Sequence, residues 1–345
     1  MSTPPLTAAD IQKHLDNLTK PPGSLGRLET LAAELCRIQQ TLRPVTRPRS
    51  LVLFAGDHGV VAEGVTAWPS SVTGLMITNI VRGGAASSVL AVATNTRLRM
   101  VDVGSLAPEV PSTPTYSARK VRAGTRNLAR EAALTVDEFL AAVRVGQEEA
   151  ERELLAGAKM LATGEMGIGN TTPAACLAML LADVPLQQAV GRGAGSDDVV
   201  LARKRQVVDG AVARARLQSG QDRIAAVASV CGLEIAAMAG FYMAGARGRA
   251  TLVLDGYIAT AAALIAEDLQ PGTMKCAVGS HLSAEPGHAA MLQKLNVAPC
   301  LHDWGMRLGE GTGALTALPL LDAAAAICGE MATFAQAGID RAGDR

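Results

Sequence analysis

The sequence has no excess of charge of either sign, and this absence limits its partners. Lysine and arginine total 32, aspartate and glutamate also total 32, and the formal net charge at pH 7 is +0. Without a net field, the chain has no long-range attraction for nucleic acid or for an anionic membrane surface. We therefore expect neither as a partner, and a charged ligand has to be bound by local groups.

The cysteines lack the spacing of a zinc site, and no two of them form a CxxC pair. They stand at Cys36, Cys176, Cys231, Cys276, Cys300 and Cys328. Buried free thiols in a reducing cytoplasm are the ordinary interpretation. The first residues, MSTPPLTAADIQKHL, also lack the basic patch and the apolar run of a secretory signal, and Asp10 stands where the run would be. We expect a cytoplasmic protein without a metal or another cofactor.

Several familiar nucleotide and hydrolase motifs are missing as well. The sequence has no GxxxxGK[ST] loop, no GxGxxG after the first predicted strand and no GxSxG elbow. It also lacks the acidic pair before a DxxxxGxT-like loop that a diphosphate-activated ribose donor with magnesium would need. Two features remain: loops that are suited to binding a single phosphate, and two isolated glutamates.

The chain is long and apolar enough for one large core, or for a main domain with a smaller attachment, because 49% of its 345 residues are hydrophobic. Five short apolar runs predict strands, and stretches of helical composition lie between them. The predicted strands are 51–55, 98–103, 159–163, 251–255 and 274–279, and two of the helices are 135–155 and 201–217. This alternation is typical of a mostly parallel sheet covered on both faces. The predicted class is α/β.

The two ends of the chain differ from this middle part. Residues 7–19 and 28–41 predict amphipathic helices around the turn KPPGSLGR, with no strand signal before Leu51. From Gly313 onward the sequence predicts one long alanine-rich helix and a polar tail. We hypothesise that the two ends pack together as a small second domain.

One apolar segment, residues 227–246, is nearly long enough to span a bilayer. It contains Glu234, and a charge at the middle of a span is costly in lipid. We expect a helix buried in the protein core instead.

A glycine-rich cluster, ATGEMGIGNTTPAA at 162–175, follows the third predicted strand. Residues 164–170 are expected to form the loop at the carboxyl end of that strand, where open α/β sheets bind ligands. Thr172 followed by Pro173 predicts an N-cap and a helix start, whose free N–H groups and dipole suit a phosphate. A tight structural turn explains the glycines equally well. It does not explain Glu165, whose carboxylate could stabilise positive charge developing on a ribose.

Glu310 lies in a second cluster, RLGEGTGA at 307–314, between two glycines that leave room for a ligand. An acidic turn residue near a helix N-terminus is the structural alternative, and this motif alone does not decide between them.

Three further loops carry polar groups. Asp57 and His58 follow the first predicted strand. They could be metal ligands, an acid–base pair or, as is more common, a hydrogen-bonded pair that closes the loop. GSHLSAEPGH at 279–288 offers hydroxyl and N–H groups for a phosphate. VGRGAG at 190–195 is followed by the basic run 203–205. A charge run of this kind is usually a solvated face, but one of its three residues could turn inward to a phosphate.

Six motifs resemble, in order and spacing, the nicotinate-nucleotide:dimethylbenzimidazole phosphoribosyltransferase family. They are KPPGSLGRLETLA (20–32), AGDHGVVAEGV (55–65), GEMGIGNTTPAA (164–175), LDG (254–256), SHLSAEPG (280–287) and MRLGEGTGAL (306–315). The resemblance implies a homodimeric enzyme with a Rossmann-like parallel sheet in residues 51–312 and a small helical domain from 1–50 plus 313–345. It implies transfer of phosphoribosyl from nicotinate mononucleotide to 5,6-dimethylbenzimidazole or a related aromatic base. The products would be nicotinate and α-ribazole 5′-phosphate, for assembly of the cobalamin nucleotide loop.

The same resemblance implies roles for individual residues. Glu310 matches the general base, and Glu165 matches the glutamate beside the ribose. The positions around the phosphate and ribose are Gly167, Asn170, Thr171, Gly193, Lys204, Ser283, Gly309 and Gly311. The acceptor-base pocket falls on Trp68, Met76 and Leu308.

The acceptor pocket departs from the family's pattern. Where the family commonly has a Ser-Pro pair and, about eight residues on, a glutamine, this chain has Trp68-Pro69 and Met76. These replacements predict a pocket that is more apolar and differently shaped. The alternative is that the two side chains only pack against a neighbouring helix. The preferred acceptor base is therefore open.

Two rival functions follow from the same residues. A nucleoside phosphorylase or hydrolase would cleave the same bond with phosphate or water. A non-catalytic nucleotide-binding protein would bind the mononucleotide without turnover, and the presence of both Glu165 and Glu310 argues against it. The sequence also leaves open whether one or two kinds of chain form the dimer.

Overall fold

A computed structural model describes residues 5–340 of the chain, apart from 194, 196 and 221. Within this part, seven strands form one sheet in the order β3-β2-β1-β4-β5-β6-β7, and each neighbouring pair is parallel. The strands are β1 Arg49–Gly56, β2 Arg97–Gly104, β3 Tyr116–Ala118, β4 Met160–Met166, β5 Thr251–Leu254, β6 Ala277–His281 and β7 Pro299–Leu301. The predicted α/β class is confirmed. The strand order reverses between β1 and β4, and ligands of such sheets bind outside the carboxyl ends at that point.

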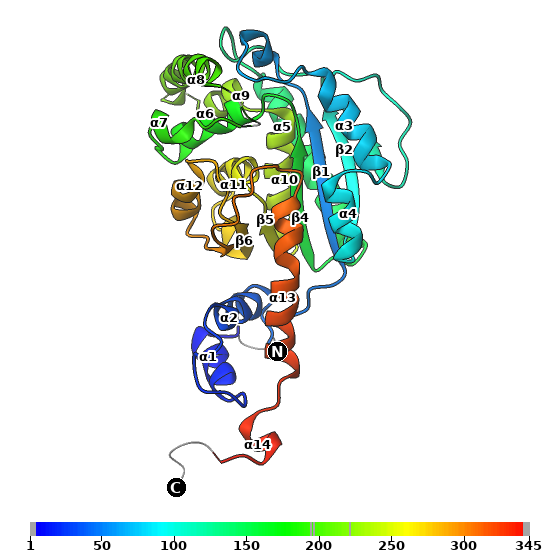
Figure 1. Cartoon of the computed structure of the whole chain (residues 1–345), viewed down its shortest axis with the longest axis vertical. Helices are drawn as coiled ribbons and strands as arrows, with labels where there is room; N and C mark the ends of the chain where they lie inside the picture. Colours follow the sequence, from blue (N-terminus) through cyan, green and yellow to red (C-terminus); the bar gives the residue numbers. More distant parts are fainter. Residues whose placement is uncertain (1–4, 194, 196, 221, 341–345) are drawn as a thin grey trace.

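Helices cover both faces of the sheet because the apolar side chains of each strand alternate between them (Figure 1). In β1, Val52 and Phe54 belong to one core cluster, and Leu51 and Leu53 belong to the other. The first cluster contains residues of α5 Val136–Leu155, α6 Thr171–Leu181, α7 Leu186–Ala189, α8 Asp198–Ser219, α9 Arg223–Val230, α10 Leu233–Arg247, α11 Tyr257–Leu269 and α12 His288–Leu295. The second contains residues of α1 Ala8–Asp16, α2 Arg27–Gln39, α3 Ser71–Val81, α4 Ala86–Ala93 and α13 Thr312–Glu330.

The remaining elements are short, and one of them shows that a predicted strand boundary was wrong. They are the 3₁₀ turns η1 Gly59–Glu63 and η2 Thr273–Cys276 and the helix α14 Phe334–Ala337. Because η2 occupies 273–276, the strand predicted at 274–279 begins only at Ala277. The strands β3 and β7 have three residues each and were not predicted.

The segment 227–246 is buried as expected, but it is not one helix. It contains the end of α9 and most of α10, separated at Cys231 and Gly232. Glu234 has no exposed surface and lies 3.0 Å from the imidazole of His58. By length and composition, Ser71–Ala93 and Thr312–Glu330 could also cross a membrane, a test that core helices pass as well.

The two ends of the chain lie together at one end of the molecule, beyond the sheet (Figure 1). The early turns of α13 pack on the sheet, and the helix continues to contact α2. The sulfur atoms of Cys36 in α2 and Cys328 in α13 are 3.0 Å apart, and Leu18 forms a β-bridge with Thr333. A domain boundary at 312/313 stays a prediction, since α13 runs unbroken through both parts.

Candidate functional site

A cavity of about 500 Å³ lies at the carboxyl ends of β4, β5 and β6, beside α3 and the segment that follows β1, where the strand order predicts a ligand site. All predicted site residues line it except Lys204 and Gly311, which lie just behind its wall. Those that line it are Trp68, Met76, Glu165, Gly167, Asn170, Thr171, Gly193, Ser283, Leu308, Gly309 and Glu310. The topology therefore gathers residues that are up to 242 positions apart, from Trp68 to Glu310, around one space.

Glu165 is the second-last residue of strand β4 rather than part of a loop. Strand β4 continues to Met166, so the predicted loop at 164–170 begins later than expected. The carboxyl group is 6% exposed, and its Oε2 accepts a hydrogen bond from the amide of Asn170. Burial, and then the nearby acids Glu234 and Asp255, raise the pKa of Glu165 to about 8. In the unliganded site this group is therefore mostly protonated at neutral pH.

The helix after this loop also begins differently from the prediction. Its N-cap is Asn170, and Thr171 is the first helical residue, so Thr172 is not the cap. The amide of Asn170 binds Glu165, and its side chain makes no capping bond to the helix. Asn170 and Thr171 face the cavity, so the first turn of α6 opens onto it.

Glu310 projects from a bend of three consecutive residues with positive φ, namely Gly309 at +84°, Glu310 at +57° and Gly311 at +70°. It is 5% exposed, and Ser87 Oγ donates to its Oε2 at 3.2 Å. Burial raises the pKa of Glu310, while hydrogen bonds from the side chain and backbone of Ser87 oppose the rise. A carboxyl group in this state can exchange a proton with a ligand in the cavity.

Hydrogen bonds to Asp255, directly after β5, hold this bend in place. The sequence analysis included Asp255 only as part of the LDG motif and assigned it no role. Its Oδ2 accepts the backbone N–H of Gly311 at 3.2 Å, and its Oδ1 accepts that of Ala314 at 3.1 Å. Asp255 thereby satisfies N–H groups at the start of α13, which otherwise have no partner within the helix. The signal in the sequence was an acid directly after a strand, but its partner lies 56 residues away.

Lys204 is the one residue of the basic run 203–205 that is buried, with 2% exposure. Its ammonium group donates to Thr171 Oγ1 at 2.7 Å and to the carbonyl of Gly191 at 3.3 Å. Burial lowers the pKa of Lys204 to about 8, although Glu285 nearby opposes the fall. A cation behind the first turn of α6 makes this end of the cavity suited to an anion.

Two further residues of this end were missed as site residues. Glu285 Oε1 accepts the backbone N–H of Gly193 at 3.0 Å. Arg307 donates to the carbonyl of Gly193 at 3.1 Å and lines the cavity. Each contact joins loops more than 90 residues apart, so local sequence patterns contain no signal for it.

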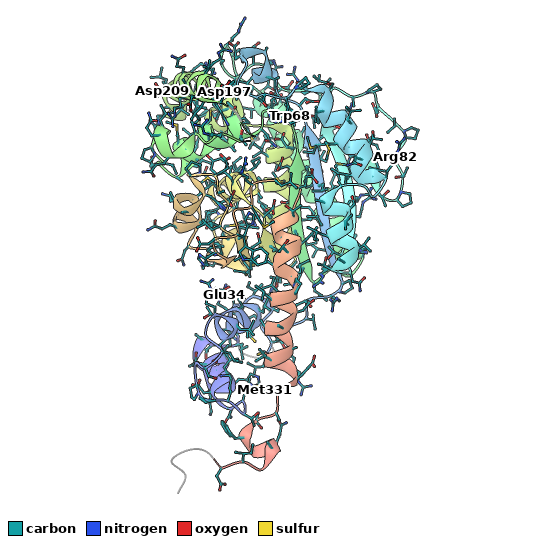
Figure 2. The ribbon with its side chains drawn as sticks, in the orientation of Figure 1. Glu34, Trp68, Arg82, Asp197, Asp209 and Met331 are labelled. Atoms are coloured by element: carbon teal, nitrogen blue, oxygen red, sulfur yellow. The ribbon has the colours of Figure 1, made fainter. Side chains whose placement is uncertain are left out.

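The other end of the cavity is apolar. Trp68, Val72, Met76, Ile168 and Leu308 line it. Trp68 is 49% exposed and Leu308 61%, so both border the opening of the cavity rather than the core. Figure 2 shows Trp68 at the opposite end of the molecule from Met331, which follows α13. A flat apolar ligand matches such a wall.

Asp57 and His58 are buried, but they do not pair with each other by a hydrogen bond. Asp57 accepts from Thr73 Oγ1 at 2.7 Å and from the backbone of Leu106 at 2.8 Å. His58 lies 3.0 Å from Glu234 without the alignment of a hydrogen bond. Asp57 and His58 therefore do not form the expected hydrogen-bonded pair, and each contacts other residues instead. Among the described residues no group of three or more His, Cys, Asp or Glu could hold a metal ion.

Comparison with known proteins gives one consistent result. The family model described as phosphoribosyltransferase matches residues 4–339. Proteins named nicotinate-nucleotide–dimethylbenzimidazole phosphoribosyltransferase are 45% identical in Thermus thermophilus, with 98% of this chain and 99% of that protein covered, and 47% identical in Chromobacterium violaceum, with 93% and 92% covered. The crystal structure of CobT from Thermus thermophilus superposes with a TM-score of 0.93 at 44% identity, covering 97% of this chain and 99% of that one.

Proposed function

The chain belongs to the nicotinate-nucleotide–dimethylbenzimidazole phosphoribosyltransferase family, and from this membership we propose the chemistry of its site. The enzyme transfers the phosphoribosyl group of nicotinate mononucleotide to 5,6-dimethylbenzimidazole or a related aromatic base, for cobalamin nucleotide-loop assembly. The products are α-ribazole 5′-phosphate and nicotinate. The observation that carries the proposed mechanism is one cavity with an anion-binding end, an apolar end and two buried glutamates between them.

The donor occupies the polar end. Its phosphate lies near Lys204, the first turn of α6 and the loop of Gly193, with Ser283 completing the enclosure. The ribose lies over Gly167, Asn170 and Glu165. The ring nitrogen of nicotinate carries a positive charge in the donor, and this charge favours the ionised form of Glu165. The resulting carboxylate stabilises the oxocarbenium-like ribose as the two rings exchange.

The acceptor stacks in the apolar end, against Trp68, Met76 and Leu308. Its unprotonated ring nitrogen attacks C1′, and the bond from C1′ to the pyridinium nitrogen breaks, with the electron pair returning to nicotinate. The acceptor's N–H proton passes to Glu310. A positioned general base contributes about 10²–10⁴-fold. In-line displacement inverts C1′ from β to α.

The decisive experiment incubates the protein with nicotinate mononucleotide and a panel of benzimidazoles, purines and phenols, and identifies ribotides by mass spectrometry. We expect α-ribotide and stoichiometric nicotinate only when a base is present. Nicotinate release without a base would indicate a hydrolase, and release that needs inorganic phosphate would indicate a phosphorylase.

We also propose a cytoplasmic homodimer. All six cysteines are free thiols, four of them buried, as expected in a reducing compartment. The outer sides of α3 and α4 expose Leu75, Val89 and Val92, which are 68%, 59% and 83% exposed, and a second copy would cover them. Light scattering of the purified chain gives the mass, and a monomer at working concentration would contradict the proposal.

A further inference from the structure

Ser87 is a buried hydroxyl whose main partner is Glu310. It lies in the first turn of α4, has no exposed surface, and donates from Oγ to Glu310 Oε2 at 3.2 Å. Around it the helix is apolar, with the sequence ASSVLAVA. This hydrogen bond joins the first turn of α4 to the bend that precedes α13, and neither helix needs it in order to form.

The backbone of Glu310 is held from another direction. Asp255, at the end of β5, accepts the N–H groups of Gly311 and Ala314. The bend cannot move far without breaking these bonds. These bonds do not by themselves fix the torsions of the Glu310 side chain, because a fixed backbone does not restrict the rotatable bonds of a glutamate. Something else must fix the direction of the carboxyl group.

We propose that Ser87 is a positioning residue for Glu310: its hydroxyl holds Oε2 and leaves Oε1 directed at the acceptor base. This inference rests on the proposed function, in which Glu310 removes the acceptor's proton. Ser87 itself does not touch substrate. It acts by keeping the basic oxygen at one place and in one orientation, which a proton transfer within hydrogen-bond distance requires.

The charges around Glu310 make the hydrogen bond from the Ser87 hydroxyl more important. The ionisable groups that face it are Asp255 directly after β5, Glu165 from β4 and His281 from β6, which lies beside Asp255. Both acids oppose a further negative charge. Removing the hydroxyl of Ser87 removes a group that favours the ionised form, so Glu310 should then require a higher pH to become a base.

The test is Ser87→Ala, with Ser88→Ala as the matched control. Ser88 is in the same turn and 8% exposed, but its hydroxyl donates to the carbonyl of Ile80 and not to Glu310. We expect Ser87→Ala to lower kcat with 5,6-dimethylbenzimidazole on the order of tenfold, the effect of one lost hydrogen bond to a charged group. KM for nicotinate mononucleotide should not change, and the acidic limb of the kcat profile should move to higher pH. Ser88→Ala should leave all three unchanged.

Two additional variants separate positioning from a general loss of structure. Ser87→Cys places a weaker donor of similar size, so its kcat should lie between those of serine and alanine, and it also serves if the alanine variant does not fold. In the background of Glu310→Gln, Ser87→Ala should cause no further loss, because its effect passes through that carboxylate.

Each result has one meaning. If wild-type enzyme forms no ribotide, the proposed function fails. If wild type is active and Ser87→Ala matches Ser88→Ala, or lowers kcat equally with and without Glu310, the positioning role of Ser87 is wrong while the proposed function stands.

Discussion

Gly164 in β4 packs directly against the backbone on both sides of the bond between Glu310 and Gly311. A β-carbon at position 164 would overlap the backbone nitrogen of Gly311 and lie 2.5 Å from the carbonyl carbon of Glu310. A β-carbon at Gly309 would in turn overlap Oε1 of Glu165. The two glutamates are therefore carried by backbones in contact, and their separation depends on glycines that leave no side chain between them.

Gly164→Ala should force these backbones apart. A displacement of about 1 Å at reacting groups can cost on the order of 10²-fold in rate, and we expect at least that loss in kcat, together with a lower Tm. Gly210→Ala is the matched control, because Gly210 lies within α8 with no atom within 4 Å of an added β-carbon. Its activity should be unchanged and its Tm equal or higher. Full activity of Gly164→Ala would show that the contact does not set the geometry.

Local sequence predicted much of this region. Strand β4 ends where the apolar run 159–163 indicated, within three residues, and both glycine clusters lie at one cavity. The sequence did not predict that Gly164 packs against the backbone of Glu310, because the two residues are 146 positions apart. The misassigned cap at Thr172 has a local reason: Asn170 was available as a cap and also as a partner for Glu165, and propensity does not show which contact prevails.

Glu310→Gln should keep the fold and donor binding but lose most turnover. The amide has the size of the carboxyl group but cannot take a proton, so kcat with benzimidazoles should fall about 10²–10⁴-fold. Steady-state assays measure this loss, and calorimetry measures binding of nicotinate mononucleotide. Glu148→Gln, at an exposed position of α5, is the control and should behave as wild type. Unchanged turnover of Glu310→Gln would remove its assignment as the base.

Binding of the donor should release a proton at pH 7. The pKa of Glu165 is raised to about 8, so the free group is mostly protonated, and the pyridinium cation of the donor should lower that pKa. Lys204 acts in the opposite sense but is already mostly charged at pH 7, since its pKa is about 8. We expect release of up to about one proton per site. Calorimetry in two buffers of different ionisation enthalpy counts it.

The controls for this release vary both partners. Glu165→Gln should abolish most of it, and ribose 5-phosphate, which has no cationic ring, should cause little release from wild type. Equal heats in both buffers with nicotinate mononucleotide and wild-type protein would contradict the protonated state of Glu165.

Lys204 should make donor affinity depend on pH. A lysine is charged below its pKa, and that of Lys204 is lowered to about 8, so the free enzyme loses this charge as the pH rises through 8. Above that value KM for nicotinate mononucleotide should rise by up to about tenfold per pH unit. Lys204→Met should raise KM at pH 7 about 10- to 100-fold and remove the dependence above pH 8. The exposed neighbour Arg203→Met provides the comparison, and an equal effect there would argue against a specific role for Lys204.

The basic run shows where sequence reasoning stops. Arg203, Lys204 and Arg205 are equivalent charges in the sequence, and the helix that carries them was predicted closely, at 201–217 against Asp198–Ser219. Which side chain turns inward depends on the rotation of α8 relative to α6 and on Thr171 as a partner. Rotation is set by tertiary packing of side chains from several helices, which the run itself does not encode.

Trp68 should select among acceptor bases. Its indole borders the apolar end of the cavity, and an aromatic face favours flat, apolar partners by stacking. Trp68→Ser should therefore lower kcat/KM for 5,6-dimethylbenzimidazole more than for purines or phenols, by about 3- to 10-fold, the value of a stacking contact near 1 kcal/mol. Competition assays with paired bases measure the ranking directly.

Trp304→Ser separates pocket effects from the general effect of losing an indole. Trp304 is the other tryptophan of the chain, is 58% exposed and does not line the cavity. Its replacement should leave the ranking of bases unchanged, and KM for the donor should be unchanged in both variants, because neither residue lies at the phosphate end. If Trp68→Ser kept the wild-type ranking, Trp68 would only pack beside α3, and Met76 and Leu308 would have to account for acceptor choice.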